Sequence, residues 1–262
     1  MNRHLPERVW LTGATSGIGL AVLEQLARQG VQVVATGRNH EVLEQLTSRF
    51  PEHVTALAGD LTDPGDVSRM AQSLAQMGPI DWAILNAGTC EYMDVREFDA
   101  EMVARVMDIN VVGAARATQA VLPVLRETVR QGRRPILAYV SSSAWWFPFT
   151  RAEAYGASKA ALTYFARSLR ADLASEGIAV SLIEPGFVKT PLTDQNDFEM
   201  PFLITSGAAA EIMIRSLVRG RRQIHFPKRF TLSLKLLRLL PESLIDRMAA
   251  AISRNQASSG NK

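Results

Sequence analysis

The sequence predicts an α/β fold built on a doubly wound parallel sheet of about seven strands, in a single domain of 262 residues. Short apolar runs alternate along the chain with longer stretches of helical periodicity. A glycine-rich turn follows the first apolar run, and polar or glycine-containing groups follow most of the later ones. Because the carboxyl ends of parallel strands lie along one edge of a sheet, we expect these groups to meet there and bind a ligand.

The first strand is expected at residues 9–12, before a turn of the form G-x-x-x-G-x-G that contains Gly13, Gly17 and Gly19. An apolar-periodic stretch at 20–28 then predicts a helix. Glycines let the backbone N–H groups of such a turn, and the positive end of the helix, approach a pyrophosphate closely. A purely structural turn is the alternative, because a glycine-rich loop alone is a weak signal.

The second strand is expected at 31–35, and Arg38 follows it closely. No Asp or Glu lies between Val31 and His40, where an NAD-binding chain usually places an acid for the ribose 2′-hydroxyl. An arginine suits a 2′-phosphate instead. The sequence therefore predicts NADP(H) in preference to NAD(H), with a solvated surface arginine as the alternative.

The later elements continue the same alternation. Strands are expected at residues 54–58, 82–85, 135–140, 179–183 and 224–227, and helices at 41–50, 64–77, 101–130 and 154–176. Residues 191–205 contain two prolines and no clear period, so we expect a substrate loop there, with an inert connector as the alternative. The chain thus divides into a cofactor-binding catalytic domain, residues 1–227, and a C-terminal extension, residues 228–262.

Tyr155 and Lys159 lie four residues apart in the helix expected at 154–176, so their side chains share one face. A positive charge close to a phenol favours the phenolate. We therefore expect Lys159 to lower the pKa of Tyr155 far enough for proton exchange near neutral pH. The pair alone is weak evidence, because this spacing also arises by chance, and its context decides the matter.

An ordered series of motifs between residues 9 and 227 resembles the short-chain dehydrogenase/reductase family. The matching pieces are Thr12-Gly13-x-x-x-Gly17-Ile18-Gly19, Asp60-Leu61, Asn86-Ala87-Gly88, Asn110, Ser142, Tyr155-x-x-x-Lys159 and Pro185-Gly186. The position of Ser142, thirteen residues before Tyr155, is typical of the family's catalytic serine. The resemblance implies a Rossmann-like fold and an NADP(H)-dependent oxidoreductase that transfers hydride between nicotinamide and a carbonyl or alcohol.

The resemblance also implies four catalytic residues. Tyr155 would protonate the alkoxide that forms as hydride reaches a ketone, and the hydroxyl of Ser142 would hold the same oxygen. Lys159 would lower the phenol's pKa and bind the nicotinamide ribose. The carboxamide of Asn110 would hold a water in a proton relay from Lys159 to solvent.

The cofactor site follows from the same resemblance. Residues 13–19 would hold the pyrophosphate, Asp60 would accept a hydrogen bond from the adenine amino group, and residues 86–88 would lie under the adenosine half. Residues 185–188 and Thr190 would bracket the nicotinamide. The expected cofactor-binding residues are Gly13, Thr15, Ser16, Gly17, Ile18, Gly19, Arg38, Asp60, Leu61, Asn86, Ala87, Gly88, Tyr155, Lys159, Pro185, Gly186, Val188 and Thr190.

Four aromatic residues crowd the segment after Ser142, which borders the substrate in the family: Trp145, Trp146, Phe147 and Phe149. They favour a hydrophobic ketone or aldehyde as the substrate, although ordinary core packing accounts for them equally well. A catalytically silent NADP(H)-binding sensor or scaffold is the alternative function. Enoyl reduction and sugar epimerisation are further nicotinamide reactions of related chains.

The C-terminal extension is basic and amphipathic. Residues 219–262 carry a net charge of +8, and the rest of the chain carries −5. As a helix, residues 228–240 would align Lys228, Thr231, Lys235 and Arg238 as a polar stripe on a largely leucine surface. A second amphipathic stretch follows Pro241. This extension can pack on the core or in a homodimer or homotetramer, cap a hydrophobic substrate site, or rest on an anionic membrane surface through residues 228–252. No nucleic-acid partner is expected, because the segment has two aromatic residues and no recognised motif.

The composition favours a cytoplasmic protein that is at most peripheral to a membrane. No apolar run approaches the ~20 residues of a membrane span, and the N-terminus leads into a strand instead of a signal-peptide core. The single cysteine, Cys90, cannot form an internal disulfide, which fits a reducing compartment. The four histidines are scattered, so no metal site is expected.

Overall fold

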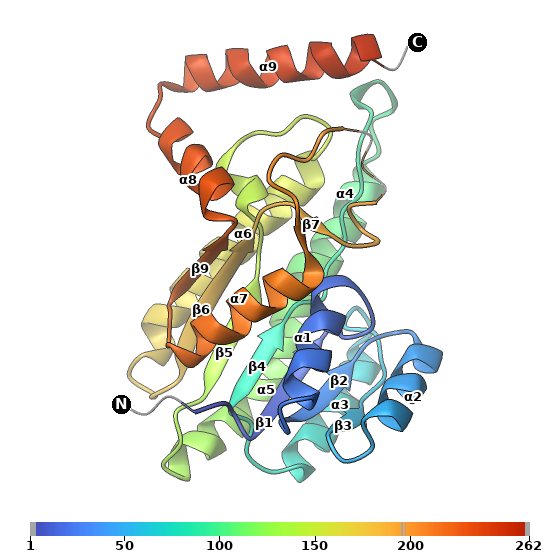
Figure 1. Ribbon diagram of the computed structural model, residues 1–262, viewed down its shortest axis with the longest axis vertical. Coiled ribbons are helices and arrows are strands. Elements are labelled where there is room, and N and C mark those ends of the chain that lie inside the picture. The colour runs from blue at the N-terminus through green and yellow to red at the C-terminus, as the bar shows by residue number, and fades with distance from the viewer. Residues whose placement is uncertain (1–3, 195, 197, 260–262) are drawn as a thin grey trace.

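In the part of the chain that the structure describes, residues 4–194, 196 and 198–259, seven parallel strands form the central sheet, as the sequence predicts (Figure 1). The structure is a computed structural model. The strand order is β3-β2-β1-β4-β5-β6-β9, so the winding of the chain reverses between β1 and β4. The strands are β1 (Arg8–Thr12), β2 (Gln32–Thr36), β3 (Val54–Ala56), β4 (Trp82–Leu85), β5 (Ile136–Val140), β6 (Ala179–Pro185) and β9 (Gln223–Phe226).

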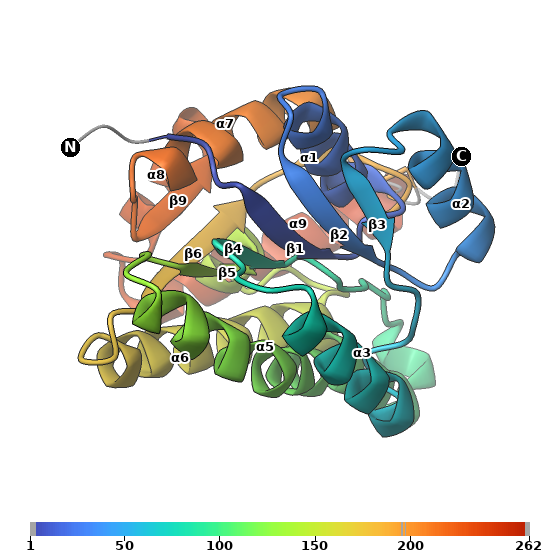
Figure 2. The same cartoon turned by 90° about the horizontal axis from the view of Figure 1, so that it is seen from below.

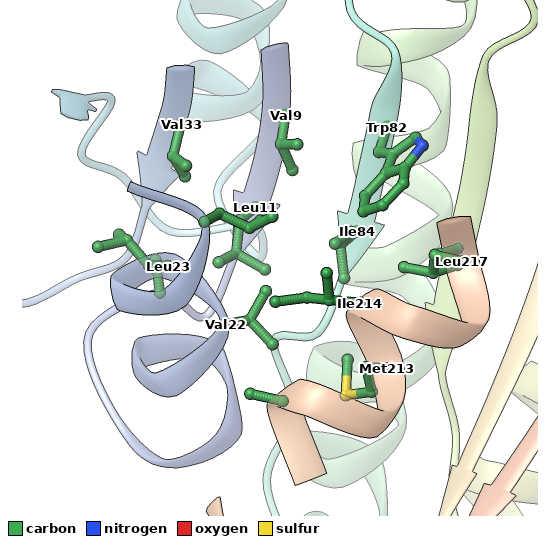
Figure 3. Close-up of a cluster of buried hydrophobic side chains, with 14 of the residues drawn as sticks. Val9, Leu11, Val22, Leu23, Val33, Trp82, Ile84, Met213, Ile214 and Leu217 are labelled. Atoms are coloured by element: carbon green, nitrogen blue, oxygen red, sulfur yellow. The ribbon is translucent and has the colours of Figure 1, made fainter. Parts of the chain in front are cut away.

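Helices cover both faces of this sheet (Figure 2). One face carries α1 (Gly17–Ala27), α2 (His40–Arg49) and α7 (Ser206–Val218), and the other carries α3 (Pro64–Gln76), α5 (Gly113–Arg130) and α6 (Glu153–Leu173). Successive side chains of β1 point to opposite faces of the sheet. Val9 and Leu11 therefore pack in the hydrophobic core under one layer of helices, and Trp10 packs in the core under the other. Figure 3 shows Val22 of α1 and Ile214 of α7 lying close to Leu11 in the first core.

The helix expected at 101–130 is interrupted, which corrects the prediction of one continuous helical region. α4 (Ala100–Met107) runs into a π turn, η2 (Asp108–Val112), and α5 begins at Gly113. A π turn locally widens the helical repeat and is frequent at functional sites. Here the turn carries Asn110, which is fully buried.

The segment expected as a substrate loop, residues 191–205, starts and ends beside a small second sheet. β7 (Val188–Lys189) pairs in parallel with β8 (Ile204–Thr205), and the chain continues directly into α7, a helix that was not predicted. The pairing holds the two ends of the loop together, so the loop projects from a fixed base. Two residues of the loop, 195 and 197, lie outside the described residues.

The C-terminal extension folds as α8 (Lys228–Leu237) and α9 (Glu242–Ser259) at one end of the molecule (Figure 1). Phe230 of α8 is buried with Trp146 and Phe147, so the extension contacts the protein's own core. The predicted polar stripe faces inward in part, because Thr231 is fully buried. Outward-facing leucines of the extension are more than half exposed: Leu232, Leu236 and Leu239. Among the described helices, none combines the length and apolar character that a membrane crossing requires.

Candidate active site

The glycine-rich turn between β1 and α1 leaves no room for side chains at two of its glycines. Gly13 has a φ of +64°, in the left-handed region that favours glycine. A Cβ at Gly13 would lie 2.8 Å from the Cα of Ala87, and one at Gly19 would lie 2.0 Å from the carbonyl oxygen of Gly13. The turn is therefore a backbone cradle at the start of α1, and a pyrophosphate fits such a cradle.

The segment after β4 is held against this turn by hydrogen bonds. Asn86 Nδ2 donates to the carbonyl oxygen of Gly13 at 3.1 Å. The backbone N–H groups of Asn86 and Ala87 both donate to Oγ1 of Thr12, at 3.1 and 3.2 Å. Thr12 is fully buried at the end of β1, and this fixing role for it was not predicted. It anchors the backbone that was expected to lie under the adenosine half of the cofactor.

Tyr155 and Lys159 lie together near the start of α6, as their spacing predicts. Lys159 Nζ is 5.6 Å from the centre of the Tyr155 ring. The same atom donates a hydrogen bond of 3.1 Å to the carbonyl oxygen of Val140, the last residue of β5, and the lysine is only 4% exposed. The pair is thus fixed at the carboxyl edge of the sheet.

Burial dominates the ionisation of both groups. It raises the pKa of Tyr155 to about 12, even though a hydrogen bond with the Ser142 hydroxyl acts to lower that pKa. Burial also lowers the pKa of Lys159 to about 8. The expectation that the pKa of Tyr155 is lowered toward neutrality is therefore wrong for this structure, because desolvation of the phenolate outweighs the stabilising contacts. At neutral pH the phenol is protonated and can donate a proton.

Three consecutive serines follow β5, and their contacts differ. The hydroxyls of Ser141 and Ser143 donate to backbone carbonyl oxygens at 2.9 and 3.0 Å. The hydroxyl of Ser142 accepts a hydrogen bond from the backbone N–H of Ala144 and interacts with the phenol of Tyr155. Ser142, the serine that the spacing favours, is therefore the one of the three whose hydroxyl lies against the Tyr155 phenol.

Asn110 is fully engaged with protein groups. Its Nδ2 donates to the carbonyl oxygen of Thr89 and to Oγ of Ser158, both at 2.9 Å, and its Oδ1 accepts from the Thr89 N–H at 2.8 Å. A Cβ at Gly88 would lie 2.9 Å from Asn110 Oδ1 and 3.2 Å from Lys159 Nζ, so the two side chains flank that glycine. Both amide hydrogens are used by protein groups, so the carboxamide fixes the backbone beside Lys159. The expected role of the carboxamide in holding a relay water stays a prediction, and the second acceptor site of Oδ1 is the one that could serve it.

These elements enclose a cavity of about 180 Å³, the catalytic cavity, at the carboxyl edge of the sheet. A Cβ on Gly17 would lie 3.1 Å from the methyl group of Thr190. The glycine-rich turn and the segment after β7 therefore lie close to each other in the cavity wall. The predicted residues that line the cavity are Gly13, Ser16, Gly17, Ile18, Asn86, Ala87, Gly88, Ser142, Tyr155, Lys159, Pro185, Gly186, Val188 and Thr190.

The other predicted site residues do not line this cavity: Thr15, Gly19, Arg38, Asp60, Leu61 and Asn110. Arg38 and Asp60 form an ion pair of 3.7 Å beyond it, after β2 and β3, and the arginine side chain is 73% exposed. Thr15, in the glycine-rich turn after β1, lies against the segment after β2 that carries Arg38. A Cβ on Gly37 would lie 2.7 Å from the methyl group of Thr15. Leu61 is 8% exposed and packs in the second hydrophobic core.

Two residues near the catalytic pair were not predicted. Tyr92, in the segment after β4, donates to Asn196 Oδ1 at 2.7 Å and meets the ring of Phe198 edge-on, which ties the expected substrate loop to the site. Cys90 interacts electrostatically with Tyr155, and burial raises the pKa of its thiol to about 11. No local motif marks either residue, so only the folded chain reveals them.

The aromatic segment after Ser142 serves as core. Trp146 and Phe147 are 4% and 5% exposed and pack with Phe230 of α8, while Trp145 and Phe149 pack at the margin of the same cluster. Among the described residues that line the catalytic cavity, none comes from this aromatic group. Of the two interpretations that the sequence left open, the structure favours core packing.

Comparison with known proteins identifies the class that this fold and site define. The family model for short chain dehydrogenases matches residues 7–200. The chain therefore belongs to the short-chain dehydrogenase family of oxidoreductases, as its motifs predict. An uncharacterized oxidoreductase of Myxococcus xanthus is 36% identical to it over 248 residues, which cover 91% of this chain and 94% of that protein.

Solved structures of short-chain dehydrogenases share the fold. One from Burkholderia cenocepacia, in complex with NADP, has a TM-score of 0.81 at 22% identity and covers 95% of this chain and 99% of its own. Another from Burkholderia phymatum, in complex with NAD, has a TM-score of 0.80 at 20% identity and covers 90% of this chain and 94% of its own.

Proposed function

We propose that the protein is an NADP(H)-dependent oxidoreductase that reduces a hydrophobic ketone or aldehyde to an alcohol. The observation that carries the proposal is the shared cavity, in which the backbone cradle meets Ser142, Tyr155 and Lys159. A nicotinamide dinucleotide bound in this cavity would supply the hydride. Membership of the family, and the NAD and NADP held by two structural neighbours, support such a cofactor.

The side chains of the cavity account for the proton that the reduction needs. Tyr155 donates its phenolic proton to the carbonyl oxygen as negative charge develops there, and the Ser142 hydroxyl holds that oxygen by a second hydrogen bond. The buried ammonium of Lys159 stabilises the phenolate that is left behind. Asn110 keeps this arrangement in place, because it binds Thr89 on one side and Ser158, the neighbour of Lys159, on the other.

The proposed preference for NADP(H) rests on Arg38. This arginine follows the second strand by two residues and has Asp60 as its ion-pair partner, while most of its side chain faces solvent. A guanidinium in this position can turn toward a 2′-phosphate and bind it with two hydrogen bonds.

The proposed hydrophobic substrate rests on apolar residues of the cavity and the loop beside it. Val188, Pro191 and Leu192 line the cavity. Phe198 lies nearby in the loop, edge-on to both Tyr92 and Phe187. An apolar carbonyl compound would bury its surface against these groups, whereas a strongly polar one would lose hydration without new partners.

The test is a screen of hydrophobic ketones, aldehydes and quinones with NADPH, followed by the loss of NADPH absorbance. We expect turnover with at least one compound and weaker turnover with short polar carbonyl compounds. NADPH binding without turnover of any compound would refute the proposal and favour the sensor or scaffold function.

A further inference from the structure

A second cavity, of about 250 Å³, lies between α6, α8, β6 and the short helix η3 (Ser143–Trp146). We call it the basic cavity. It shares no described lining residue with the catalytic cavity. Trp145 and Trp146, three and four residues after Ser142 in the chain, line it. No part of the proposed reaction uses this space.

Four cationic side chains line the basic cavity from two helices. Arg167 and Arg170 come from α6, and Lys235 and Arg238 come from α8 and its C-terminal end. Within the described residues, none of the four forms a salt bridge with a carboxylate. Arg170 donates instead to two backbone carbonyl oxygens, of Val180 and of residue 222, at 3.0 and 2.7 Å.

One carboxylate lines the described wall of the cavity, and it is already satisfied. Glu184 is fully buried, and its Oε1 accepts from the indole N–H groups of Trp145 and Trp146 at 2.8 and 3.2 Å. Its Oε2 accepts from Gln223 Nε2 at 2.6 Å. Four cations therefore face one carboxylate whose oxygens are occupied, and the cavity has an excess of positive charge.

The indole rings contact two of these cations. Lys235 Nζ lies 4.9 Å from the centre of the Trp146 ring, and the Arg238 guanidinium lies 4.5 Å from that of Trp145. Burial lowers the pKa of Arg170, and the positive charges of Arg222 and Arg167 lower it further against the opposing effect of Glu184, so Arg167 and Arg170 repel each other. A bound anion would remove that repulsion and would stabilise the folded protein by linkage.

We propose that the basic cavity binds the phosphate group of a ligand. The cations approach from two helices, so a suitable anion must accept hydrogen bonds from several directions. A phosphate spreads its charge over three or more oxygens in a tetrahedral arrangement, whereas a carboxylate offers two oxygens in one plane. Guanidinium groups also bind phosphate oxygens in pairs, which suits Arg167 and Arg238.

The phosphate could belong to a soluble compound or to a phospholipid headgroup. Exposed leucines on α8 and in the turn after it give the second source its physical basis: Leu232, Leu236 and Leu239. An apolar stripe next to a phosphate-binding cavity would contact acyl chains while the headgroup sits among the cations. Both sources require the same cavity chemistry, so one set of variants tests both.

The first experiment follows tryptophan fluorescence during titration with inorganic phosphate at constant ionic strength. Trp145 and Trp146 line the basic cavity, whereas Trp10 and Trp82 are buried in the two main cores, so binding changes the signal of the first pair. Arg167→Gln should weaken phosphate binding about tenfold, since it removes a charge-assisted contact. Arg229→Gln is the matched control, because Arg229 is exposed on α8 and does not line the cavity.

The control variant should bind phosphate as the unchanged protein does. Equal weakening in both variants would mean that phosphate responds only to the overall basic charge of the region, and this would overturn the proposal. Citrate that binds more tightly than phosphate would also overturn it, because a carboxylate site would then be present. This experiment measures binding, so its result does not depend on whether the protein oxidises NADPH.

The second experiment separates the two sources with vesicles of phosphatidylglycerol and of phosphatidylcholine. Arg167-dependent binding to phosphatidylglycerol vesicles, exceeding that of inorganic phosphate, would assign the cavity to a phospholipid headgroup. Arg167-dependent binding of inorganic phosphate without vesicle binding would assign it to a soluble phosphate compound. Absence of both, with the fluorescence unchanged, would refute a phosphate site.

Discussion

Lys159 is the residue whose protonation state should control the rate of reduction. The residue is 4% exposed, and burial lowers the pKa of its ammonium to about 8. Below that pH the ammonium is charged and can stabilise the Tyr155 phenolate that forms as the proton leaves. Above it the neutral amine cannot, while the phenol itself stays protonated because burial raises its pKa to about 12.

The first prediction concerns this pH dependence. The rate constant for ketone reduction by NADPH should be constant below about pH 8 and fall as the pH rises through that value, because the cation is lost there. Stopped-flow measurement of single-turnover reduction between pH 6 and pH 10, at saturating NADPH, would show the step. A rate that rises over this range would assign the controlling group to a base instead.

The second prediction concerns Arg38 and the choice between the two cofactors. Arg38→Asp should weaken NADPH binding about 10- to 100-fold, because it replaces charge-assisted hydrogen bonds to a 2′-phosphate with repulsion, and should leave NADH binding nearly unchanged. Arg130→Asp is a suitable control, because Arg130 ends α5 and its side chain is similarly exposed, at 71%. Equal weakening of NADPH and NADH by Arg38→Asp would remove Arg38 from the phosphate site.

At the level of elements, the glycine-rich turn is the most tightly constrained part of the site. A methyl group at Gly19 would lie 2.0 Å from the carbonyl oxygen of Gly13, so the turn has to open to accept it. The third prediction is that Gly19→Ala lowers NADPH affinity by at least about tenfold and lowers the melting temperature by several degrees. Calorimetric titration and thermal melting would measure the two effects.

The control for this substitution is Gly207→Ala in α7. A Cβ there would meet only Gln25 Nε2, at 3.9 Å, which is ordinary contact. Alanine is favoured over glycine within a helix by roughly 0.5–1 kcal/mol, so this variant should be equally or more stable and should bind NADPH normally. Unchanged NADPH affinity in Gly19→Ala would contradict the assignment of the turn as the pyrophosphate cradle.

Elements with a local signal could be predicted from the sequence. The seven strands of the central sheet and the turn after β1 were predicted because apolar runs and glycines mark them directly, whereas the two-residue strands β7 and β8 were not predicted. The spacing of Tyr155 and Lys159 placed them on one helix face, and the ordered series of motifs singled them out. The π turn at Asn110 was missed, because a one-residue widening leaves the helical period of 101–130 almost unchanged. The raised pKa of Tyr155 was missed as well, because burial depends on segments far away in the chain.

At the scale of the whole molecule, α8 and the segment after Ser142 create a feature that no single motif encodes. The basic cavity needs residues from 145–146, 167–170 and 235–238 to converge, and these ranges meet only after the sheet is complete. The sequence showed the polar stripe of α8 but not that this stripe partly faces inward. The exposure of the leucines Leu232 and Leu236 on α8 therefore could not be predicted from periodicity alone.

The fourth prediction treats the molecule as one cooperative unit. NADPH at a concentration about 100 times its dissociation constant should stabilise the fold by roughly 2.7 kcal/mol, which corresponds to a rise in melting temperature of about 5–10 °C. NADH at the same concentration should produce a smaller rise if Arg38 binds the 2′-phosphate. Thermal melting with each cofactor would measure this, and equal rises would argue against the NADP(H) preference.

The most direct test of the account is the effect of Tyr155→Phe on NADPH oxidation with a ketone that the unchanged protein reduces. The substitution removes only the phenolic hydroxyl, so the account predicts a rate lower by about a hundredfold or more and a dissociation constant for NADPH that is nearly the same. A variant that still reduces the ketone at the original rate would show that the proton comes from another group.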